Sequence, residues 1–291
     1  MNVVSKCVIS FKSKALKMKF QYDIKETILK VENVSLSMGG RLILRDVNVD
    51  VKNIVRPNMK QGQIVGFVGP SGIGKTKFFE VLAGLIKPDS GTVLIGDPLK
   101  PVTTGQVGVV QQSYPLFNHR TVKSNLEIAA QNGDIPTAER ASKIQKMLER
   151  FNLAEHFNKY PAELSGGQRQ RVAIAQQLLC SEHFLLMDEP FSGLDILMIE
   201  RVRQMLLEIA CEHEHNTIIV VSHDIYATAS IADTLWVMGR DRNEKGNIIE
   251  GSKIKHTFDL AERGVCWHDD VQSRAEFKEV VEEVRSLFPT L

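Results

Sequence analysis

A glycine-rich string in the first third of the chain has the residue types needed to hold phosphate groups. It runs Gly69-Pro70-Ser71-Gly72-Ile73-Gly74-Lys75-Thr76 and fits the pattern GxxxxGK[ST]. Glycines let the backbone curl so that successive N–H groups point inward at phosphate oxygens, and a following helix N-terminus adds its dipole. In such a loop the lysine bridges the β- and γ-phosphates, and the Thr76 hydroxyl ligates Mg²⁺. The string therefore predicts a nucleotide-phosphate site.

Two adjacent carboxylates follow an apolar run later in the chain. Asp188 and Glu189 come directly after Phe184-Leu-Leu-Met187, and Pro190 enforces a turn behind them. In a phosphoryl-transfer site the first carboxylate would hold Mg²⁺ through its water shell, and the second would polarise the attacking water. Acidic residues at strand ends are common, so the phosphate loop upstream is what makes this interpretation specific.

A histidine stands at the end of another apolar run. His223 follows Thr217–Ser222, and the carboxyl ends of strands in an open parallel sheet converge on the ligand crevice. We expect His223 to contact the γ-phosphate and to steady Glu189 and its water. A structural histidine satisfied by hydrogen bonds is the alternative interpretation.

Alternating strand and helix patterns must position these residues. The apolar run Gln63–Val68 predicts a buried strand that leads into the glycine loop, and Phe78–Ile86 predicts the helix behind it. Strand patterns recur later with helices between them, which implies a parallel sheet covered by helices. The remaining strand-like segments are residues 28–51, 184–187, 217–221 and 234–238, and mostly helical patterning occupies residues 122–180.

The two ends of the chain carry patterns of their own. Residues 1–27 are locally basic, and the alternation of Leu16, Met18, Phe20 and Tyr22 with Lys or Gln predicts an edge strand. An arm for membrane headgroups or nucleic acid is the alternative. At the other end, Ser273 and Glu276 have capping-box spacing before an amphipathic helix that Pro289 stops. We expect this helix to pack on its own domain, the alternative being a partner. Its apolar face comprises Phe277, Val280, Val281, Val284, Leu287 and Phe288.

Composition excludes several classes of protein. Lys+Arg 36 against Asp+Glu 35 leaves a formal charge of +1, so no global field favours nucleic acid or an anionic membrane surface. The cysteines are scattered without a CxxC pair, which favours four reduced thiols in a cytosolic protein over a disulfide framework. No apolar run approaches the roughly 18 residues that span a bilayer. Lys6 interrupts the only apolar stretch at the N-terminus, so we expect no signal peptide.

In this order, the strings resemble the nucleotide-binding subunit of ATP-binding cassette (ABC) transporters over about residues 28–239. Leu164-Ser165-Gly166-Gly167-Gln168 matches the signature of that family, and Asp188–Glu189 matches its Walker B pair. Ser192–Asp195 matches its D-loop, and Gln112 matches its Q-loop glutamine. The resemblance implies an α/β fold with a P-loop NTPase core, in which a parallel sheet is joined by an antiparallel β subdomain and a helical insert.

The resemblance also implies a domain organisation. An ABC nucleotide-binding domain would occupy residues 28–245, with the helical insert at about residues 113–180. Residues 1–27 would form a basic N-terminal extension with an extra strand. Residues 246–291 would form a C-terminal tail that ends in the amphipathic helix.

The family's functional residues can be carried over position by position. Catalysis would rest on Glu189, His223 and Gln112. Mg²⁺ would be held by Thr76, Gln112 and Asp188. The residues that would bind ATP are Met38, Gly69, Pro70, Ser71, Gly72, Ile73, Gly74, Lys75, Thr76, Ser165, Gly166, Gly167, Gln168 and Asp195.

Two positions depart from the family pattern. Met38 stands where an aromatic residue usually stacks on adenine, and a thioether on the ring would weaken that contact or make it less selective. Gln176 replaces the arginine usual after Ala175, so one salt contact typical of the family is expected to be absent. Neither change touches the hydrolytic residues.

A function and a set of partners follow from the resemblance. Two copies would dimerise head to tail around two ATP molecules, with Ser165 and Gly167 of one copy at the γ-phosphate held by Lys75 of the other. The motor would lie in the cytoplasm on the inner face of the cell membrane, beneath a separate integral-membrane permease. It would power import of a small solute, with an extracytoplasmic solute-binding protein as a possible further partner.

The transported solute and the class of cassette stay open at this point. The tail around Leu260–Trp267 is similar to that of the nitrate/sulfonate/taurine group. One alternative is a mechanical cassette that extracts lipid or lipoprotein or serves cell division. Another is an ABC ATPase linked to nucleic acid or ribosomes. We expect no nucleic-acid partner, because ABC proteins that act on nucleic acid or ribosomes usually carry two cassettes in one chain or a long insertion. This sequence has neither.

Overall fold

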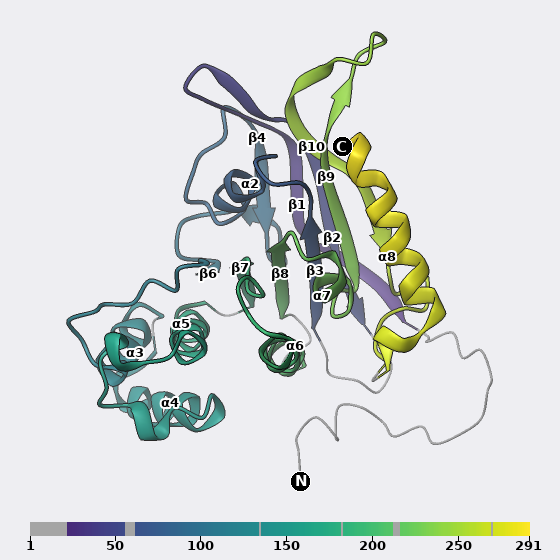
Figure 1. Ribbon diagram of the computed structural model, residues 1–291. Coiled ribbons are helices and arrows are strands. Elements are labelled where there is room, and N and C mark those ends of the chain that lie inside the picture. The colour runs from purple at the N-terminus through teal and green to yellow at the C-terminus, as the bar shows by residue number, and fades with distance from the viewer. Residues whose placement is uncertain (1–21, 56–61, 134, 182, 212–215, 269) are drawn as a thin grey trace.

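A ten-stranded sheet organises the computed structural model, which describes residues 22–55, 62–133, 135–181, 183–211, 216–268 and 270–291 (Figure 1). The strand order is β5-β4-β1-β2-β10-β9-β3-β8-β7-β6. The edge strand predicted for residues 16–22 lies, apart from Tyr22, outside the described residues, as do residues 56–61 around Pro57. In the described part of the chain, no helix is long and apolar enough to cross a membrane.

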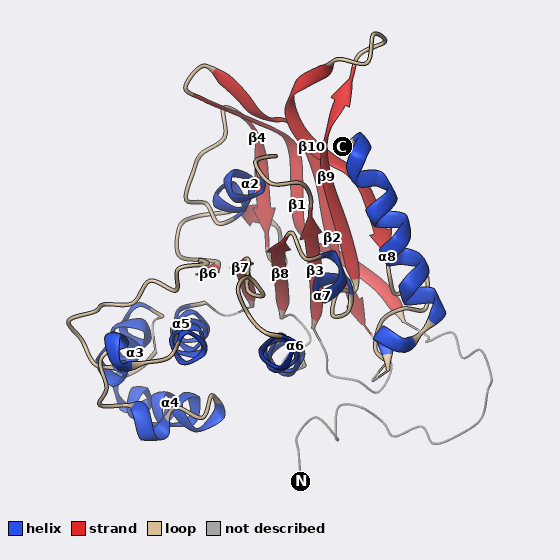
Figure 2. Ribbon diagram, viewed as in Figure 1, coloured by secondary structure: helices blue, strands red, loops and turns tan. Residues whose placement is uncertain are grey.

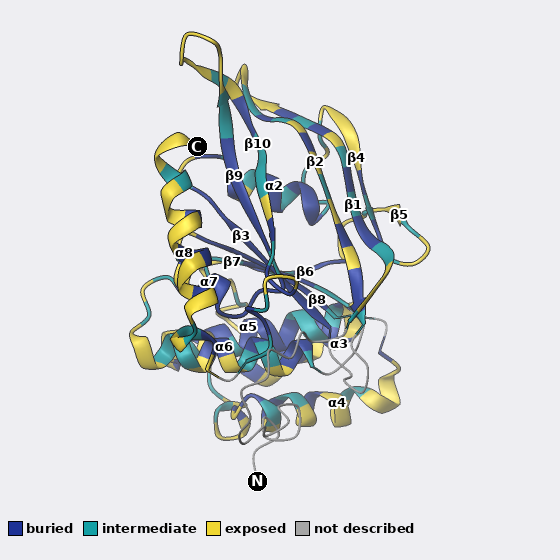
Figure 3. Ribbon diagram, turned by 90° about the vertical axis from the view of Figure 1, so that its right-hand side faces the viewer, coloured by how far each residue is buried: buried dark blue, intermediate teal, exposed yellow. Residues whose placement is uncertain are grey.

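The parallel half of the sheet is the centre of the fold (Figure 2). Every residue of β3 and β8 is buried (Figure 3), as expected of strands covered on both faces. Ile64 joins a hydrophobic cluster with the helical insert, whereas the next residue, Val65, joins a cluster that includes helix α2. The parallel sheet predicted from the apolar runs is therefore confirmed. Its strands are β3 (Gln63–Val68), β6 (Gly108–Val110), β7 (Phe184–Asp188), β8 (Thr217–Ser222) and β9 (Thr234–Arg242).

The antiparallel half continues the same sheet instead of forming a separate one. Strand β10 (Ile248–Asp259) joins the halves, because it pairs antiparallel with β9 and touches β2 in parallel at Ser252 and Leu44. Sequence analysis assigned these residues only to a tail, so the structure adds a strand there. The antiparallel strands are β1 (Asp23–Met38), β2 (Arg41–Val55), β4 (Ser90–Ile95) and β5 (Lys100–Pro101).

Three helices form the insert between β6 and β7, at one end of the sheet in Figure 1. They are α3 (Val122–Asn132), α4 (Thr137–Arg150) and α5 (Gly166–Cys180). Buried Gln176 of α5 donates hydrogen bonds from its amide to the backbone oxygen of Asn125 at 3.2 Å and to its side-chain oxygen at 3.3 Å. At the position where the family usually has an arginine, Gln176 therefore makes neutral amide hydrogen bonds to Asn125.

Two predicted helix boundaries are wrong. Helix α2 (Lys75–Leu82) ends before Ile86, because Gly84 adopts a left-handed φ of 68° and its N–H bonds back to the Val81 carbonyl. Helix α8 (Ala275–Leu287) has Arg274 as its N-cap residue and no side-chain cap, so the predicted capping box does not form. The Ser273 hydroxyl instead donates to the Asp270 carbonyl at 2.8 Å.

The apolar face of α8 packs on the rest of the described chain. Phe277, Val280, Val281 and Val284 are buried in a hydrophobic cluster with α7 (Ile225–Ala229) and β9. The ring of Phe277 meets the ring of Tyr226 edge to face, with 4.9 Å between centroids. The expectation that this helix packs on its own domain is confirmed, and it packs on the short helix that begins directly after His223.

An ionic cluster fastens β2 to β9 and β10. The Asp241 carboxylate accepts from Lys253, from Lys255 and from Arg45, the last at 2.6 Å. The hydrogen bonds from Lys253 and Lys255 hold the pKa of the Asp241 carboxyl at about 2, below the ordinary 3.8. The contact lies where β10 and β2 share a single pair of residues, so side-chain charges reinforce a narrow backbone junction.

We expect the stability contributed by Asp241 to depend on pH. A carboxyl with a lowered pKa in the folded state stabilises the fold above its unfolded pKa, and this contribution disappears as pH falls from about 4 to 2. Asp241→Asn should lower the free energy of unfolding by about 1 kcal/mol at pH 6, with solvent screening considered. Urea unfolding of both proteins between pH 6 and pH 3 should show the difference shrink, whereas exposed Asp50→Asn should change little. A difference independent of pH would contradict the assignment.

Candidate active site

The glycine loop lies between β3 and α2, as the sequence predicts. Gly72 has a φ of 73° with open space where a Cβ would stand, and Gly74, with a φ of 104°, precedes the first residue of α2. The Lys75 ammonium is buried at 8% exposure and donates to the carbonyls of Gly69 at 2.8 Å and Pro70 at 3.0 Å. Burial lowers the pKa of Lys75, and the carboxylates of Glu189 and Asp188 oppose that change. The loop therefore holds the Lys75 ammonium next to backbone that no side chain covers at Gly72.

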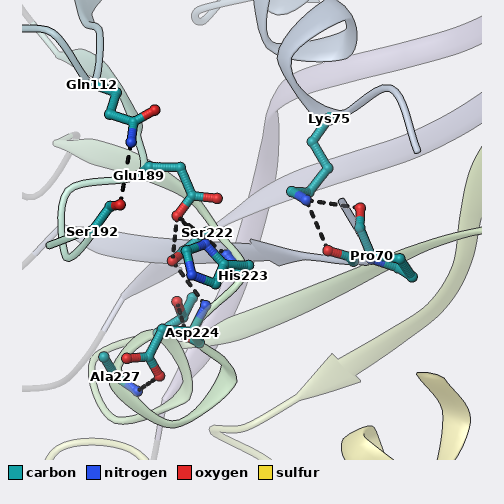
Figure 4. A network of polar contacts seen from close by, with 11 residues as sticks. Pro70, Lys75, Gln112, Glu189, Ser192, Ser222, His223, Asp224 and Ala227 are labelled. Atoms are coloured by element: carbon teal, nitrogen blue, oxygen red, sulfur yellow. Dashed lines mark hydrogen bonds and ion pairs between the residues drawn. The ribbon is translucent and has the colours of Figure 1, made fainter. Parts of the chain in front are cut away.

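Glu189 accepts several hydrogen bonds directly after β7 (Figure 4). Its Oε2 atom lies 2.8 Å from His223 Nδ1, 3.1 Å from Ser222 Oγ and 3.3 Å from the His223 backbone nitrogen. A carboxylate only accepts, so Nδ1 carries the proton in this contact. Glu189 also has a φ of 50°, which strains a residue with a side chain by about 1 kcal/mol. Such strain is typical of functional sites.

A pocket beside Glu189 has the oxygen atoms that a hard cation prefers. Thr76 from α2, Gln112 after β6 and Asp188 at the end of β7 all line it. Burial and the neighbouring Glu189 raise the pKa of the Asp188 carboxyl, and Lys75 opposes the rise. Gln112 donates from Nε2 to Ser192 Oγ at 3.2 Å, which orients its amide. Hydroxyl, amide and carboxylate oxygens fit Mg²⁺, which usually takes its remaining ligands from water and substrate phosphates.

The described chain contains no cluster of three or more His, Cys, Asp or Glu side chains that could hold a metal alone. The Thr76–Asp188 pocket combines a hydroxyl of the phosphate loop with the half-buried carboxylate of Asp188, and Glu80 lines it as well. Water and phosphate oxygens usually complete the ligand set of Mg²⁺.

The signature residues belong to another part of the molecule. Ser165 caps α5, because its hydroxyl accepts from the Gln168 N–H while the Gln168 side chain accepts from the Ser165 N–H. Among the described residues, Gly167 of the signature and Thr76 of the glycine loop line two different hollows.

The last two predicted nucleotide contacts lie at chain turns. Asp195 is the N-cap residue of α6 (Ile196–Ala210), where its carboxylate accepts from the Met198 N–H at 2.9 Å. Met38 ends β1 and is exposed at 43%, so its thioether is accessible to a ligand.

Three polar residues for which the sequence predicted no catalytic or ligand-binding role support the site. Fully buried Ser222 donates to Glu189 and accepts from the Asp224 N–H at 3.1 Å. Asp224 caps α7 by accepting from the Ala227 N–H at 2.9 Å, and Ser192 holds Gln112. The sequence does carry one indication for Ser222, because this serine ends an apolar strand directly before His223.

Comparison with known proteins places the chain in a family. The family model described as ABC transporter matches residues 53–192. The arginine transport ATP-binding protein ArtM of Bacillus subtilis is 34% identical over 239 residues, which cover 79% of this chain and 93% of ArtM. The chain belongs to the ATP-binding proteins of ABC transporters. The resemblance stated from the motifs is thereby confirmed.

Other relatives of this ABC ATP-binding chain are longer. The sulfate/thiosulfate import ATP-binding protein CysA of Thermosynechococcus vestitus is 33% identical over 220 residues, or 75% of this chain and 63% of CysA. The chain thus spans about three-fifths of the length of the CysA relatives it matches.

Solved structures of ABC ATP-binding proteins share the fold. CbiO1 of Clostridium perfringens, part of the transporter complex cbiONQ, aligns with a TM-score of 0.67 and 25% identity over 91% of this chain and 97% of that one. A dimeric ATP-binding cassette in a post-hydrolysis state, bound to ADP and Pi, aligns with a TM-score of 0.62 and 26% identity. That alignment covers 80% of this chain and 99% of the cassette. The predicted P-loop NTPase fold is confirmed.

Proposed function

We propose that this chain binds and hydrolyses ATP and that hydrolysis drives a separate membrane permease. The observation that carries the proposal is the meeting of Lys75, Asp188 and Glu189 after β3 and β7. Burial lowers the pKa of Lys75 and raises that of Asp188, and the negative charge of Glu189 favours a higher pKa for both groups. His223 lies 2.8 Å from the Glu189 carboxylate. This arrangement combines a phosphate-binding cation, a metal-binding carboxylate and a general base in one place.

Each residue has a defined role in this proposal. The glycine loop and Lys75 bind the phosphates, and Thr76, Gln112 and Asp188 hold Mg²⁺, which neutralises phosphate charge when bound. Glu189 orients and deprotonates the attacking water. His223 fixes the Glu189 carboxylate through the 2.8 Å contact and would contact the γ-phosphate of bound ATP. Met38 lies against adenine.

Two copies are needed for a complete site in this proposal. Ser165, Gly166, Gly167, Gln168 and Asp195 reach ATP only across an interface with a second copy. The dimeric state of the related cassette bound to ADP and Pi supports this arrangement. Helix α5 would direct its N-terminal dipole at the γ-phosphate held by the other copy. ATP then joins the copies, and hydrolysis separates them.

The names of the relatives support import of a small solute. They include ATP-binding proteins for sulfate/thiosulfate import and for arginine transport. We propose that the motor acts at the inner face of the cell membrane, with a permease and an extracytoplasmic solute-binding protein, and without nucleic acid. A solute of the nitrate/sulfonate/taurine class, and the domain limits at residues 28 and 245, are part of the same proposal.

Purification of partners tests the permease. Affinity capture of the tagged chain from native membranes in mild detergent, followed by mass spectrometry, should recover a multi-span protein in stoichiometric amount. A tagged Lys75→Ala variant should recover the same protein, if docking on the permease is separate from nucleotide binding. Recovery of ribosomal or nucleic-acid-bound partners instead would contradict import and leave the ATPase assignment standing.

We expect Ser222→Ala to slow hydrolysis without weakening ATP binding. The change removes one donor to Glu189 and one acceptor for Asp224, so the general base loses part of its orientation. One hydrogen bond to a charged group corresponds to about a tenfold fall in kcat, with KM for ATP little altered. Steady-state phosphate release over a range of ATP concentrations measures both, with Ser286→Ala on α8 as the matched control. A rise in KM at unchanged kcat would contradict this role.

A further inference from the structure

A second hollow lies between α5 and α6, apart from the pocket at Thr76. Its volume is about 200 Å³. It is bordered by the C-terminal end of α4 and by the first turns of α5. Its lining includes Arg150, Gly167, Arg171, Met198, Arg201 and Glu208.

Positive charge exceeds negative charge around this hollow. Three guanidinium groups line it, against the single carboxylate of Glu208. The Arg150 guanidinium lies over the ring of Phe151, 5.1 Å from its centroid. In the described part of the chain, neither Arg171 nor Arg201 has an ion pair with a carboxylate. The Arg171 Nε atom is buried and has no hydrogen-bond partner among the described residues.

Nearby Arg203 is a buried arginine whose guanidinium group has hydrogen-bond partners. Arg203, two residues after Arg201 on α6, is buried and bonded to Glu200, to Ser230 Oγ at 2.6 Å and to the Ser230 carbonyl at 3.3 Å. Arg171 lacks such partners, and both burial and the like charge of Arg201 lower its pKa. Arg171 is half-buried and Arg201 is exposed, so the cost falls on the buried Nε atom of Arg171, which lacks a hydrogen-bond partner beside a second cation. An anion in the hollow would remove that cost.

We propose that the hollow between α5 and α6 is a binding site for a small, multiply charged anion of the phosphate class, held by Arg171 and Arg201. Guanidinium groups present paired N–H donors that match phosphate oxygens. Two of them facing one ligand favour a charge of at least two. The cavity volume suits a phosphate group with a small substituent or a second phosphate.

The position of the site couples it to the proposed motor. Gly167 of the signature lines the hollow, and a Cβ added at Gly167 would meet Met198 Cε at 2.8 Å. The anion would tie α5, whose N-terminus carries the signature, to α6, whose N-cap is Asp195. Binding itself does not rest on the proposed ATPase function; only an effect on turnover would.

Calorimetric titration with pyrophosphate tests the site. The titration is made without nucleotide or Mg²⁺, and every chain compared carries Lys75→Ala, so that the glycine loop binds pyrophosphate weakly and no ATP joins two copies. We expect one saturable site per chain. Arg201→Gln should weaken it at least tenfold, and Arg201→Glu should abolish it. Arg201 is exposed, so folding should be unaffected, which a melting curve confirms.

The matched control is Arg169→Gln, on an exposed residue of α5 that does not line the hollow. It should bind pyrophosphate as the chain with Lys75→Ala alone does. The absence of saturable binding to that reference chain, or equal weakening by Arg169→Gln, overturns the proposal. The proposal is also overturned if Arg201→Gln changes self-association and leaves pyrophosphate binding unchanged. The guanidinium groups would then pair with a carboxylate of a second copy.

Discussion

Glu189→Gln is expected to reduce steady-state ATP hydrolysis at least 100-fold while leaving ATP affinity within about threefold, as removal of a general base typically does. The amide has nearly the shape of the carboxylate, but it cannot take a proton from water. It also changes the contacts at the Oε2 atom, where Ser222 and His223 now converge. Phosphate release and binding of a fluorescent ATP analogue measure the two quantities separately.

The control for this variant is Glu279→Gln, on the C-terminal helix, which should hydrolyse ATP at the normal rate. Turnover by Glu189→Gln at the normal rate would remove Glu189 from the role of base. Loss of both hydrolysis and binding would indicate that Glu189 supports the site's structure.

The second large effect is expected for Lys75→Ala, which should lose ATP affinity by roughly two to four orders of magnitude. Two charge-assisted hydrogen bonds to phosphate contribute about 1.5–3 kcal/mol each. The Lys75 ammonium donates to the Gly69 and Pro70 carbonyls, so the loop holds the cation where the phosphates would bind. Equilibrium dialysis with labelled ATP and Mg²⁺ measures the loss.

Lys87→Ala is the matched control for that measurement. Lys87 is an exposed lysine that follows α2 and does not line the Thr76 pocket. The variant should bind ATP within about twofold of the unaltered chain, because a solvated surface charge contributes little. If both lysine variants lost affinity equally, general charge and not the loop geometry would explain binding.

The sequence predicted the parallel core well, because buried parallel strands are continuous apolar runs. Gln63–Val68 was assigned at its observed limits for this reason. Strand β10 was missed, since Lys253, Lys255 and His256 give it a polar composition and its place in the sheet depends on long-range pairing with β9 and β2. The early end of α2 depends on the backbone angle of Gly84, which no residue pattern had indicated.

The candidate site divides in a similar way. Lys75, Asp188, Glu189 and His223 could be chosen from short strings, because parallel strands end at one edge and bring such residues together. Ser222 could not be ranked from sequence, since its contribution is a hydrogen bond to a side chain 33 residues away. The proximity of Arg171 on α5 to Arg201 on α6 could not be predicted for the same reason, because the two residues are far apart in the sequence and belong to no common motif.

The central claim is that ATP joins two copies of this chain through Lys75 of one and the signature of the other. The most direct test is the molar mass of Glu189→Gln in solution, measured by sedimentation with and without ATP. We predict a monomer without nucleotide and a dimer with ATP, and no dimer when Ser165→Arg is added to block the signature. A mass that ATP leaves unchanged, in a variant shown to bind ATP, would contradict the account.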